Sequence, residues 1–294
     1  MRHHFTLSKP LNSLRICALL LGASAVFFSG GRTAAAEKVY SLGVVPQQSA
    51  TRLAQIWIPF LDRLERETGY KFKFATAKDI PTFEACLSDQ AYDFAYMNPY
   101  HYTVVHETAG YEAFAHQADK KLKGILVTRS DSSVAALEDL DGYTLAFPSP
   151  AAFGASVVPR AELSAAGVSF EAAYVKSHDS VYRAVALGVF PAGGGVLRTF
   201  GNLPEDLKSQ LRVFYRTEGY TPHAFAAAPA VPADVRETVA AAMTGLDDDA
   251  VLGALGMSGF VPAGDAAWDD VRALNLTAGQ TEIASAGEET CHSN

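Results

Sequence analysis

The sequence predicts an α/β protein of two lobes, and three observations lead to this prediction. Stretches patterned as strands alternate with stretches patterned as helices, and short connections join them. The alternation runs through the first half of the chain and starts again in the second, and each run indicates a mostly parallel sheet covered by helices. The chain has 294 residues, so two such blocks suggest two lobes with a cleft between them.

Residues 1–36 predict a cleaved secretory signal peptide. They contain four lysines and arginines but no acidic residue. Residues 16–28 form an apolar run that is too short to cross a bilayer comfortably. Small residues then lead to Ala34-Ala35-Ala36, which matches the end of a signal sequence. We therefore expect export; the alternative is an uncleaved N-terminal anchor.

The first block reads strand, helix, strand, helix, strand. Its first helix has Ser49 as a cap, an apolar stripe that includes Trp57, and Gly69 as a stop. Pro59 lies inside this helix and should kink it. The expected strands cover residues 39–45, 71–76 and 92–97, and the second helix runs from Asp79 to Leu87.

The second block repeats this rhythm. Its expected strands cover residues 144–147, 173–176, 190–196 and 212–217, and its expected helices cover residues 151–163, 181–187, 204–211, 233–243, 250–255 and 266–274. Residues 123–130 and 215–221 are the expected crossings, which would let the lobes close about a hinge. One lobe would contain residues 37–128 and 218–276, the other residues 129–217, and residues 277–294 would form a mobile tail.

Composition and charge exclude several classes of protein. The chain is 49% hydrophobic and 19% charged, which excludes a disordered protein. Its net charge of −8 argues against a nucleic-acid partner, and any anion site must be a local arrangement of dipoles and donors. Of the three cysteines, Cys86 and Cys291 follow the signal and can pair or stay free. Cys86 reads as a buried thiol or, alternatively, as a soft ligand for arsenite or a metal.

Polar and aromatic residues gather where strands of the predicted sheets end, which is where open α/β sheets bind ligands. His178 and Asp179 open a helix, where they can cap it or face a ligand. Arg198 can balance a buried anion or form a surface salt bridge. The other candidates, which alternatively are turn and core residues, are Gln47, Gln48, Tyr96, Asn98, Tyr100 and Tyr102.

The sequence contains no signature of an enzyme or of a cofactor site. It has no G-x-S-x-G motif, no P-loop and no H-E-x-x-H motif. The run Gly193-Gly194-Gly195 lacks the Gly-Lys-Ser/Thr ending of a phosphate loop, so we expect the backbone there to approach a ligand or the other lobe closely. The histidines show no short metal-binding spacing, and we expect no metal.

Several motifs together resemble a known family. They are Gly43-Val44-Val45-Pro46, Asp93-Phe94-Ala95-Tyr96-Met97-Asn98-Pro99-Tyr100, Leu145-Ala146-Phe147-Pro148-Ser149-Pro150 and Ser177-His178-Asp179-Ser180, in this order. The set resembles the periplasmic substrate-binding proteins of phosphonate, phosphite and phosphate ABC importers, over roughly residues 40–271. It is also similar to a branch that includes arsenite-sensing proteins paired with histidine kinases.

The resemblance implies a type II periplasmic-binding-protein fold, no catalysis and a histidine, here His178, that contacts the ligand. Where the family has Ser-Thr-Ser-Gly at the start of a helix, this chain has Ala151-Ala152-Phe153-Gly154, so hydroxyls are lost while backbone N–H groups remain. Ser149, Ala152 and Phe153 are therefore ligand-binding candidates. We expect a periplasmic monomer that passes a small oxyanion to an ABC permease or, alternatively, reports it to a sensor kinase.

Overall fold

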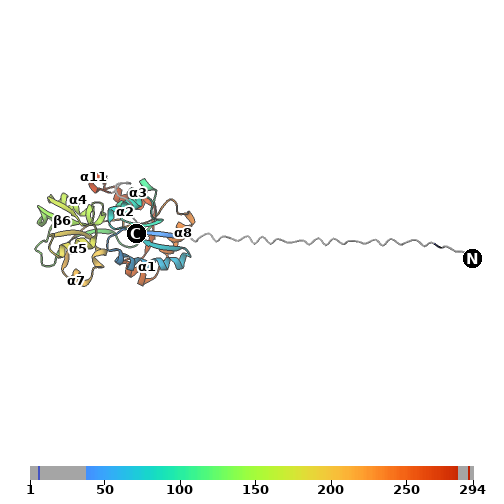
Figure 1. Cartoon of the computed structure of the whole chain (residues 1–294). Coiled ribbons are helices and arrows are strands. Elements are labelled where there is room, and N and C mark those ends of the chain that lie inside the picture. Colours follow the sequence, from blue (N-terminus) through green and yellow to red (C-terminus); the bar gives the residue numbers. More distant parts are fainter. Residues whose placement is uncertain (1–5, 7–37, 284–290, 292–294) are drawn as a thin grey trace, which may run out of the picture. The chain divides into compact units, whose positions relative to one another are not determined.

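Two β-sheets with helices packed on them form the part of the chain that this computed structural model describes, namely Thr6, residues 38–283 and Cys291 (Figure 1). The predicted signal peptide, apart from Thr6, lies outside the described residues. In Figure 1, β6, α4, α5 and α7 belong to one half of the molecule, and α1, α3 and α8 belong to the other. No helix among the described residues is long and apolar enough to span a membrane.

The first sheet has the strand order β11-β4-β10-β3-β1-β2. Its strands are β1 (Val39–Val44), β2 (Lys71–Ala75), β3 (Phe94–Met97), β4 (Glu112–Gln117), β10 (Ala224–Ala227) and β11 (Phe260–Pro262). The strand β1 pairs in parallel with β2 and β3, whereas β10 is antiparallel to β3 and β4. The ends of β1 and β3 therefore meet at one edge of this sheet.

Eight helical segments among the described residues belong to the first half of the molecule, and the ends of α1 follow the expected signals. They are α1 (Ala50–Thr68), α2 (Ile80–Ser88), α3 (Pro99–Ala109), α8 (Ala233–Thr244), α9 (Asp249–Leu255), η3 (Asp265–Trp268), α10 (Asp269–Arg272) and α11 (Ala278–Thr281). The Ser49 hydroxyl accepts the Arg52 N–H at the start of α1, and Gly69 ends this helix with a left-handed φ of 74°. The buried stripe of α1, with Trp57 fully inside, anchors the helix to the sheet.

The second sheet has the strand order β7-β6-β8-β5-β9. Its strands are β5 (Leu122–Arg129), β6 (Tyr143–Phe147), β7 (Phe170–Tyr174), β8 (Ala192–Val196) and β9 (Leu211–Tyr220). The helical segments are η1 (Leu137–Leu140), η2 (Phe153–Val157), α4 (Val158–Ala165), α5 (His178–Ala186), α6 (Leu197–Gly201) and α7 (Glu205–Lys208). The chain leaves the first sheet between β4 and β5 and returns to it between β9 and β10.

Several elements differ from their predicted form. The helix expected at residues 151–163 starts at Phe153 with the π-helical turn η2, and the strand expected at residues 173–176 lies at Phe170–Tyr174. The sequence pattern did not predict α3, β4, β10 or β11. The expected crossings 123–130 and 215–221 fall largely within β5 and β9, which pair with each other antiparallel. The fold class itself is as predicted, because both blocks build a sheet covered by helices.

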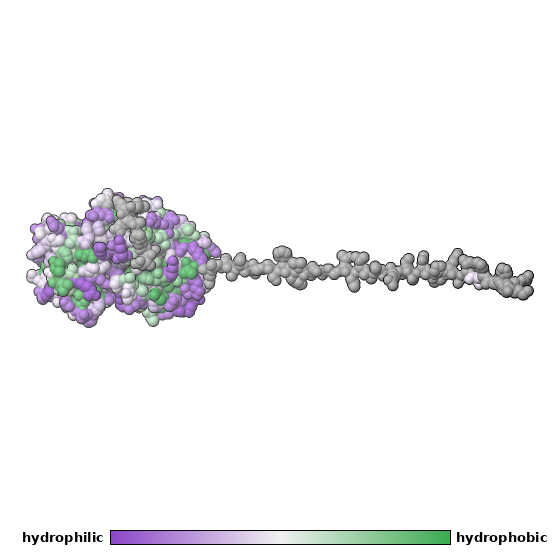
Figure 2. Space-filling view, viewed as in Figure 1, coloured by the Kyte–Doolittle hydropathy of each residue, from purple (hydrophilic) through white to green (hydrophobic). Residues whose placement is uncertain are grey.

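One large hydrophobic core contains residues from both sides of the cleft. It joins Trp57 and Tyr96 of the first half with Phe153 and Val196 of the second, all of them buried. Two smaller cores lie on the two faces of the second sheet. Hydrophilic and hydrophobic residues are interspersed on the face that Figure 2 shows. The two halves are thus packed against each other in this conformation.

The C-terminal residues contact both halves. Cys291 forms a disulfide with Cys86, so neither reading of Cys86 as a thiol or as a metal ligand holds. The Thr281 hydroxyl donates to the Tyr100 hydroxyl at 3.0 Å, and Arg160 Nη2 donates to the Gln280 carbonyl at 3.3 Å. The expected mobile tail therefore includes attached residues, while residues 284–290 and 292–294 lie outside the described residues.

Candidate functional site

A small pocket lies between the two sheets and is called the inner pocket here. It is lined by Val45, Gln47, Ile80, Asn98, Ala152, Phe153, Gly154, Ala155, His178, Val196 and His223. These residues follow the ends of strands in both sheets, which is the position where open α/β sheets bind ligands. The inner pocket is thus built from both halves of the molecule.

Helix N-termini surround the inner pocket. The Asn98 side chain caps α3 by accepting the His101 N–H at 2.8 Å, and the Ser177 hydroxyl caps α5 by accepting the Ser180 N–H at 3.1 Å. The segment η2 begins at Phe153 and runs directly into α4. The first N–H groups of a helix have no acceptor within the helix and carry partial positive charge, so this edge of both sheets favours an anion.

Two buried histidines contribute neutral hydrogen-bonding groups. Burial and the nearby Arg198 charge lower the pKa of His178 to about 3 and hold the pKa of His223 well below its usual value. The Gln47 amide Nε2 lies 3.1 Å from His223 Nε2, and because this amide nitrogen only donates, His223 Nε2 is the acceptor. The ring of His223 stacks on Tyr96, with centroids 4.9 Å apart. Each imidazole is therefore uncharged at neutral pH.

Arg198 supplies the positive charge of this region. It lies just after β8, in α6, and its Nη2 donates to the Gln47 side-chain oxygen. Its guanidinium carbon lies 5.5 Å from the centroid of the Tyr96 ring, within cation–π range. Within the described part of the chain, no carboxylate oxygen forms an ion pair with this guanidinium, so its charge is not neutralised by the protein.

Direct hydrogen bonds join the two halves across the cleft. The His178 N–H donates to the Gln47 carbonyl at 3.0 Å, and Asn98 Nδ2 donates to the Ala151 carbonyl at 3.1 Å. A cavity of only about 10 Å³ remains in the inner pocket, close to the minimum for one water molecule. The buried Phe153 ring lies among its walls. The two halves are therefore in direct contact at the inner pocket, which holds at most about one water molecule in this conformation.

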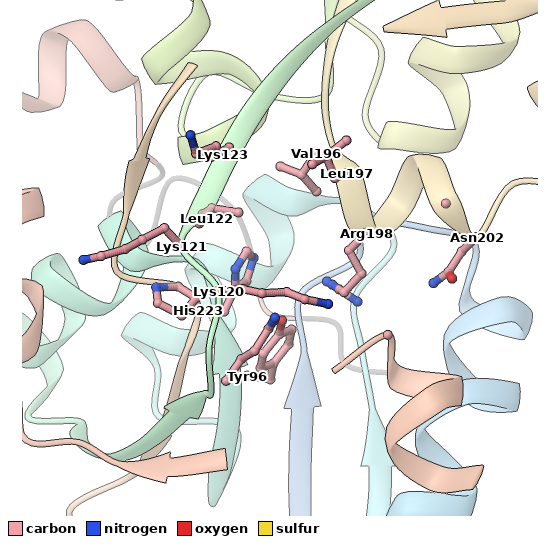
Figure 3. A pocket seen from close by; sticks show the side chains of 14 residues that line it. Tyr96, Lys120, Lys121, Leu122, Lys123, Val196, Leu197, Arg198, Asn202 and His223 are labelled. Carbon is pink, nitrogen blue, oxygen red and sulfur yellow. The ribbon is translucent and has the colours of Figure 1, made fainter. Parts of the chain in front are cut away.

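A second and larger cavity, here called the outer pocket, adjoins the first (Figure 3). It has a volume of about 480 Å³ and shares Val196 and His223 with the inner pocket. Figure 3 shows Lys120 reaching across it towards Arg198, near Tyr96 and His223. It is lined by Tyr96, Gln117, Lys120, Lys121, Leu122, Lys123, Val196, Leu197, Arg198, Gly201, Asn202, Pro222, His223 and Gly256.

The predicted site residues lie in four places: the inner pocket, the outer pocket, a separate surface pocket, and the buried interior away from these pockets. Gln47, Asn98, Ala152, Phe153 and His178 line the inner pocket, and Tyr96 and Arg198 line the outer pocket. Gln48 and Asp179 line a separate surface pocket of about 510 Å³ with Ser49 and Arg183. The remaining three, Ser149, Tyr100 and Tyr102, are buried but line neither the inner nor the outer pocket.

Local structure explains why those three residues lie away from the pockets. The helix α3 begins at Pro99, and it turns Tyr102 to donate to Asp265 Oδ1 at 3.0 Å and to pack on Trp268. Tyr100 bonds Thr281 instead. The Ser149 hydroxyl is buried and has no hydrogen-bond partner in the described part of the chain.

His223 and Lys120 are among the pocket residues that were not predicted as ligand contacts. His223 precedes β10, a short strand whose residues Ala224-Phe225-Ala226-Ala227 show no strong strand pattern, so its place beside Tyr96 could not be inferred. Lys120 lies in the connection between the sheets, where a lysine normally indicates a solvated turn. A run of three lysines at Lys120, Lys121 and Lys123 in an acidic chain was the one available signal.

Two αβ halves with a ligand-sized cavity at their facing strand ends define a type II periplasmic binding protein. Comparisons of this chain with known protein families and solved structures agree with this class. A family model described as the periplasmic substrate-binding protein of a phosphonate ABC transporter matches residues 42–268. The chain therefore belongs to this family of phosphonate-binding proteins, and both the resemblance and the fold prediction are confirmed.

Solved structures share the fold. The binding protein component of an ABC phosphonate transporter from Pseudomonas aeruginosa is 19% identical and has a TM-score of 0.75, covering 86% of this chain and 91% of that chain. PhnD1 from Prochlorococcus marinus, in complex with methylphosphonate, is 18% identical with a TM-score of 0.72 and covers 81% and 99%. The periplasmic VFT2 domain of BvgS from Bordetella pertussis is 16% identical with a TM-score of 0.52 and covers 74% and 92%.

Proposed function

We propose that this protein captures a small oxyanion of the phosphonate or phosphate kind in the periplasm and delivers it to an ABC permease in the inner membrane. It acts as a binding protein without catalysis and, we propose, as a monomer. The two lobes are residues 37–128 with 218–276, and residues 129–217. They separate to admit the anion and close over it. Family membership supports this role, because the family consists of substrate-binding proteins of phosphonate ABC transporters.

The observation that carries the oxyanion assignment is the unneutralised Arg198 beside two uncharged histidines. A guanidinium favours the oxygen atoms of phosphonate or phosphate because its planar donors match their spacing. The Gln47 amide and the imidazoles of His178 and His223 add neutral donors or acceptors within the same region. In a closed and poorly hydrated pocket these hydrogen bonds are stronger than in water. The missing hydroxyls of the Ala151-Ala152-Phe153-Gly154 stretch leave backbone N–H groups as the donors there.

The first test is binding by the purified, ligand-stripped protein. We expect at least one of methylphosphonate, inorganic phosphate, phosphite and arsenite to raise the melting temperature. At 100 times its dissociation constant a true ligand should add roughly 2.7 kcal/mol of stability. Replacement Arg198→Ala should weaken binding about 100-fold, because it removes the charge that faces the anion.

The control is Arg236→Ala on α8, which removes the same charge from a helix that lines neither pocket. It should leave the dissociation constant unchanged. If no oxyanion of the panel binds, or if Arg198→Ala binds as well as the unmodified protein, the proposed function is wrong.

A second candidate function is ligand sensing, in which the closed protein docks on a membrane histidine kinase. The structural similarity to the periplasmic VFT2 domain of BvgS supports this alternative, because it shows that the same fold also occurs outside ABC transporter binding proteins. Neighbouring genes for a permease and an ATPase would favour import, whereas a neighbouring kinase gene would favour sensing.

A further inference from the structure

The outer pocket concentrates positive charge in a chain that is otherwise acidic. Three lysines and Arg198 line it, and no aspartate or glutamate appears among its described lining residues. The net charge of the whole chain is −8, so this local excess of cations is not a general property of the surface. The cations of the outer pocket therefore create a local positive potential that favours anions.

Of these four cations, Lys121 alone forms an ion pair with a carboxylate among the described residues. The Lys121 ammonium is paired with Asp270 at 3.3 Å, which neutralises it. By contrast, neither Lys120 nor Arg198 forms an ion pair with any carboxylate within the described residues. The two side chains extend towards each other across the cavity (Figure 3). Two like charges that converge on one space repel each other, and an anionic group between them would remove this repulsion.

The outer pocket is also connected to the inner pocket through shared walls. Val196 and His223 line both cavities, and Arg198 contacts Gln47 of the inner pocket. A volume of about 480 Å³ exceeds what a bare oxyanion needs and falls within the range of small-molecule sites. A ligand whose head lies at the inner pocket can therefore extend its organic part into the outer one.

We propose that the ligand is a two-headed anion: a phosphonate or phosphate whose organic substituent ends in a second acidic group, held by Lys120 in the outer pocket, while Arg198, which also contacts Gln47 of the inner pocket, lies between the two acidic groups. This inference rests on the proposed function. The charge of the pocket also disfavours a ligand whose organic substituent ends in an ammonium group. Such a group would be repelled by Lys120 and Arg198, and no carboxylate among the lining residues would pair with it.

The test compares three probes of matched length by isothermal titration calorimetry. These are 3-phosphonopropionate, propylphosphonate and 3-aminopropylphosphonate, whose tails are acidic, neutral and basic. We expect 3-phosphonopropionate to bind about tenfold tighter than propylphosphonate, the equivalent of one hydrogen bond to a charged group. We expect 3-aminopropylphosphonate to bind more weakly than propylphosphonate.

Variants assign the preference to the outer pocket. Lys120→Met should reduce the preference for 3-phosphonopropionate over propylphosphonate from about tenfold to less than about twofold. The matched control is Lys208→Met on α7, an exposed lysine that pairs with Glu205 and lies outside the pocket. It should preserve the preference, and thermal unfolding checks that both variants are folded.

The outcomes separate this inference from the proposed function. If propylphosphonate binds as tightly as 3-phosphonopropionate, the two-headed ligand is wrong and oxyanion capture stands. If the acidic tail is preferred but Lys120→Met keeps the preference, the assignment to Lys120 is wrong. If none of these phosphonates binds, and phosphate and phosphite fail too, the proposed function is wrong and the inference fails with it.

Discussion

His178 makes several structural contacts at the position where we propose that it faces the ligand. It is the first residue of α5, its backbone N–H crosses the cleft to Gln47, and its Nδ1 lies 3.0 Å from the Thr199 hydroxyl. Thr199 in turn lies 2.8 Å from the Tyr182 hydroxyl, so a buried polar chain fixes the imidazole. Burial keeps this ring neutral, which leaves it free to offer hydrogen bonds without the cost of a buried charge.

The low pKa of His178 predicts a loss of stability in acid. The folded-state pKa is about 3, whereas an unfolded histidine titrates near 6.5, so the unfolded chain binds the extra proton as the pH falls. The contribution of this residue is complete above pH 6.5 and is lost between pH 6.5 and 3, on the order of 3 kcal/mol by pH 4.5. Urea unfolding from pH 8 to 4.5 should show a shallower pH dependence for His178→Gln than for the unmodified protein.

The control for this measurement is His116→Gln, which changes a partly exposed histidine on β4 outside the inner pocket. It should retain the pH dependence of the unmodified protein. Equal slopes for His178→Gln and the unmodified protein would contradict the assignment of this proton to His178.

At the scale of single residues, part of the candidate site could be predicted from the sequence. Gln47, Asn98 and His178 follow strands, and Asn98 and His178 also lie at the starts of helices, so local signals place them at a shared edge without knowledge of the fold. His223 and Lys120 could not be placed in this way, because their positions depend on the antiparallel pairing of β10 with β3 and on the path of the chain between the sheets. Such contacts between distant segments leave no local pattern.

Among the elements, β8 shows why three consecutive glycines occur in a buried strand. An added Cβ at Gly194 would lie 1.9 Å from the Ala155 carbonyl oxygen, and one at Gly195 would lie 2.1 Å from the Tyr182 hydroxyl. The expectation that this run approaches a ligand or the other lobe is therefore wrong, because its close neighbours belong to η2, α5 and β6 of the same half. The glycines allow the π-helical turn and the buried Tyr182 chain to pack directly on the strand.

Replacement Gly195→Ala should destabilise the protein. The added methyl group overlaps the Tyr182 ring, which is buried and bonded to Val196 and Thr199 and cannot move without breaking these bonds. Overpacking of this kind costs about 1–3 kcal/mol, measurable as a lower urea midpoint. Gly253→Ala in α9 is the matched control, because a Cβ there meets nothing within 4 Å and its stability should stay equal or rise. An unchanged midpoint for Gly195→Ala would refute the packing argument.

The element boundaries show which signals were sufficient. Caps and left-handed glycines predicted the ends of α1 correctly, since Ser49 and Gly69 act through their immediate neighbours. Asn98 followed by Pro99 is a helix-start signal, but the aromatic residues beyond it show no clear helical stripe, so α3 is not among the expected helices. The π-turn at Phe153 depends on packing against β8, and periodicity does not reveal it.

At the scale of the whole molecule, hydrogen bonds across the cleft and the shared hydrophobic core hold the two halves together. Besides the bonds from His178 and Asn98, the Ser49 N–H donates to Asp179 Oδ2 at 3.2 Å. Each such bond contributes only about 0.5–1.5 kcal/mol net, and burial of the apolar side chains shared by the two halves adds to this. A ligand that contacts both halves then shifts the population towards closure.

Replacement Asn98→Asp should favour the open form. A carboxylate at this position still accepts the His101 N–H that caps α3, but it cannot donate to the Ala151 carbonyl across the cleft. Small-angle scattering of ligand-free protein should give a larger radius of gyration for this variant. Asp248→Asn, a change at the cap of α9 away from the cleft, should leave the radius unchanged. Identical radii for Asn98→Asp and the unmodified protein would contradict a role of this bond in closure.

The bond between Cys86 and Cys291 has a practical consequence for any laboratory that prepares this protein. It joins positions 205 residues apart, and the chain-entropy model gives a cross-link of that span a contribution of up to about 5 kcal/mol. Material made in a reducing cytosol, or stored with a thiol reagent, would lack that contribution. Melting temperatures from different preparations are therefore comparable only when the sulfur atoms have the same oxidation state.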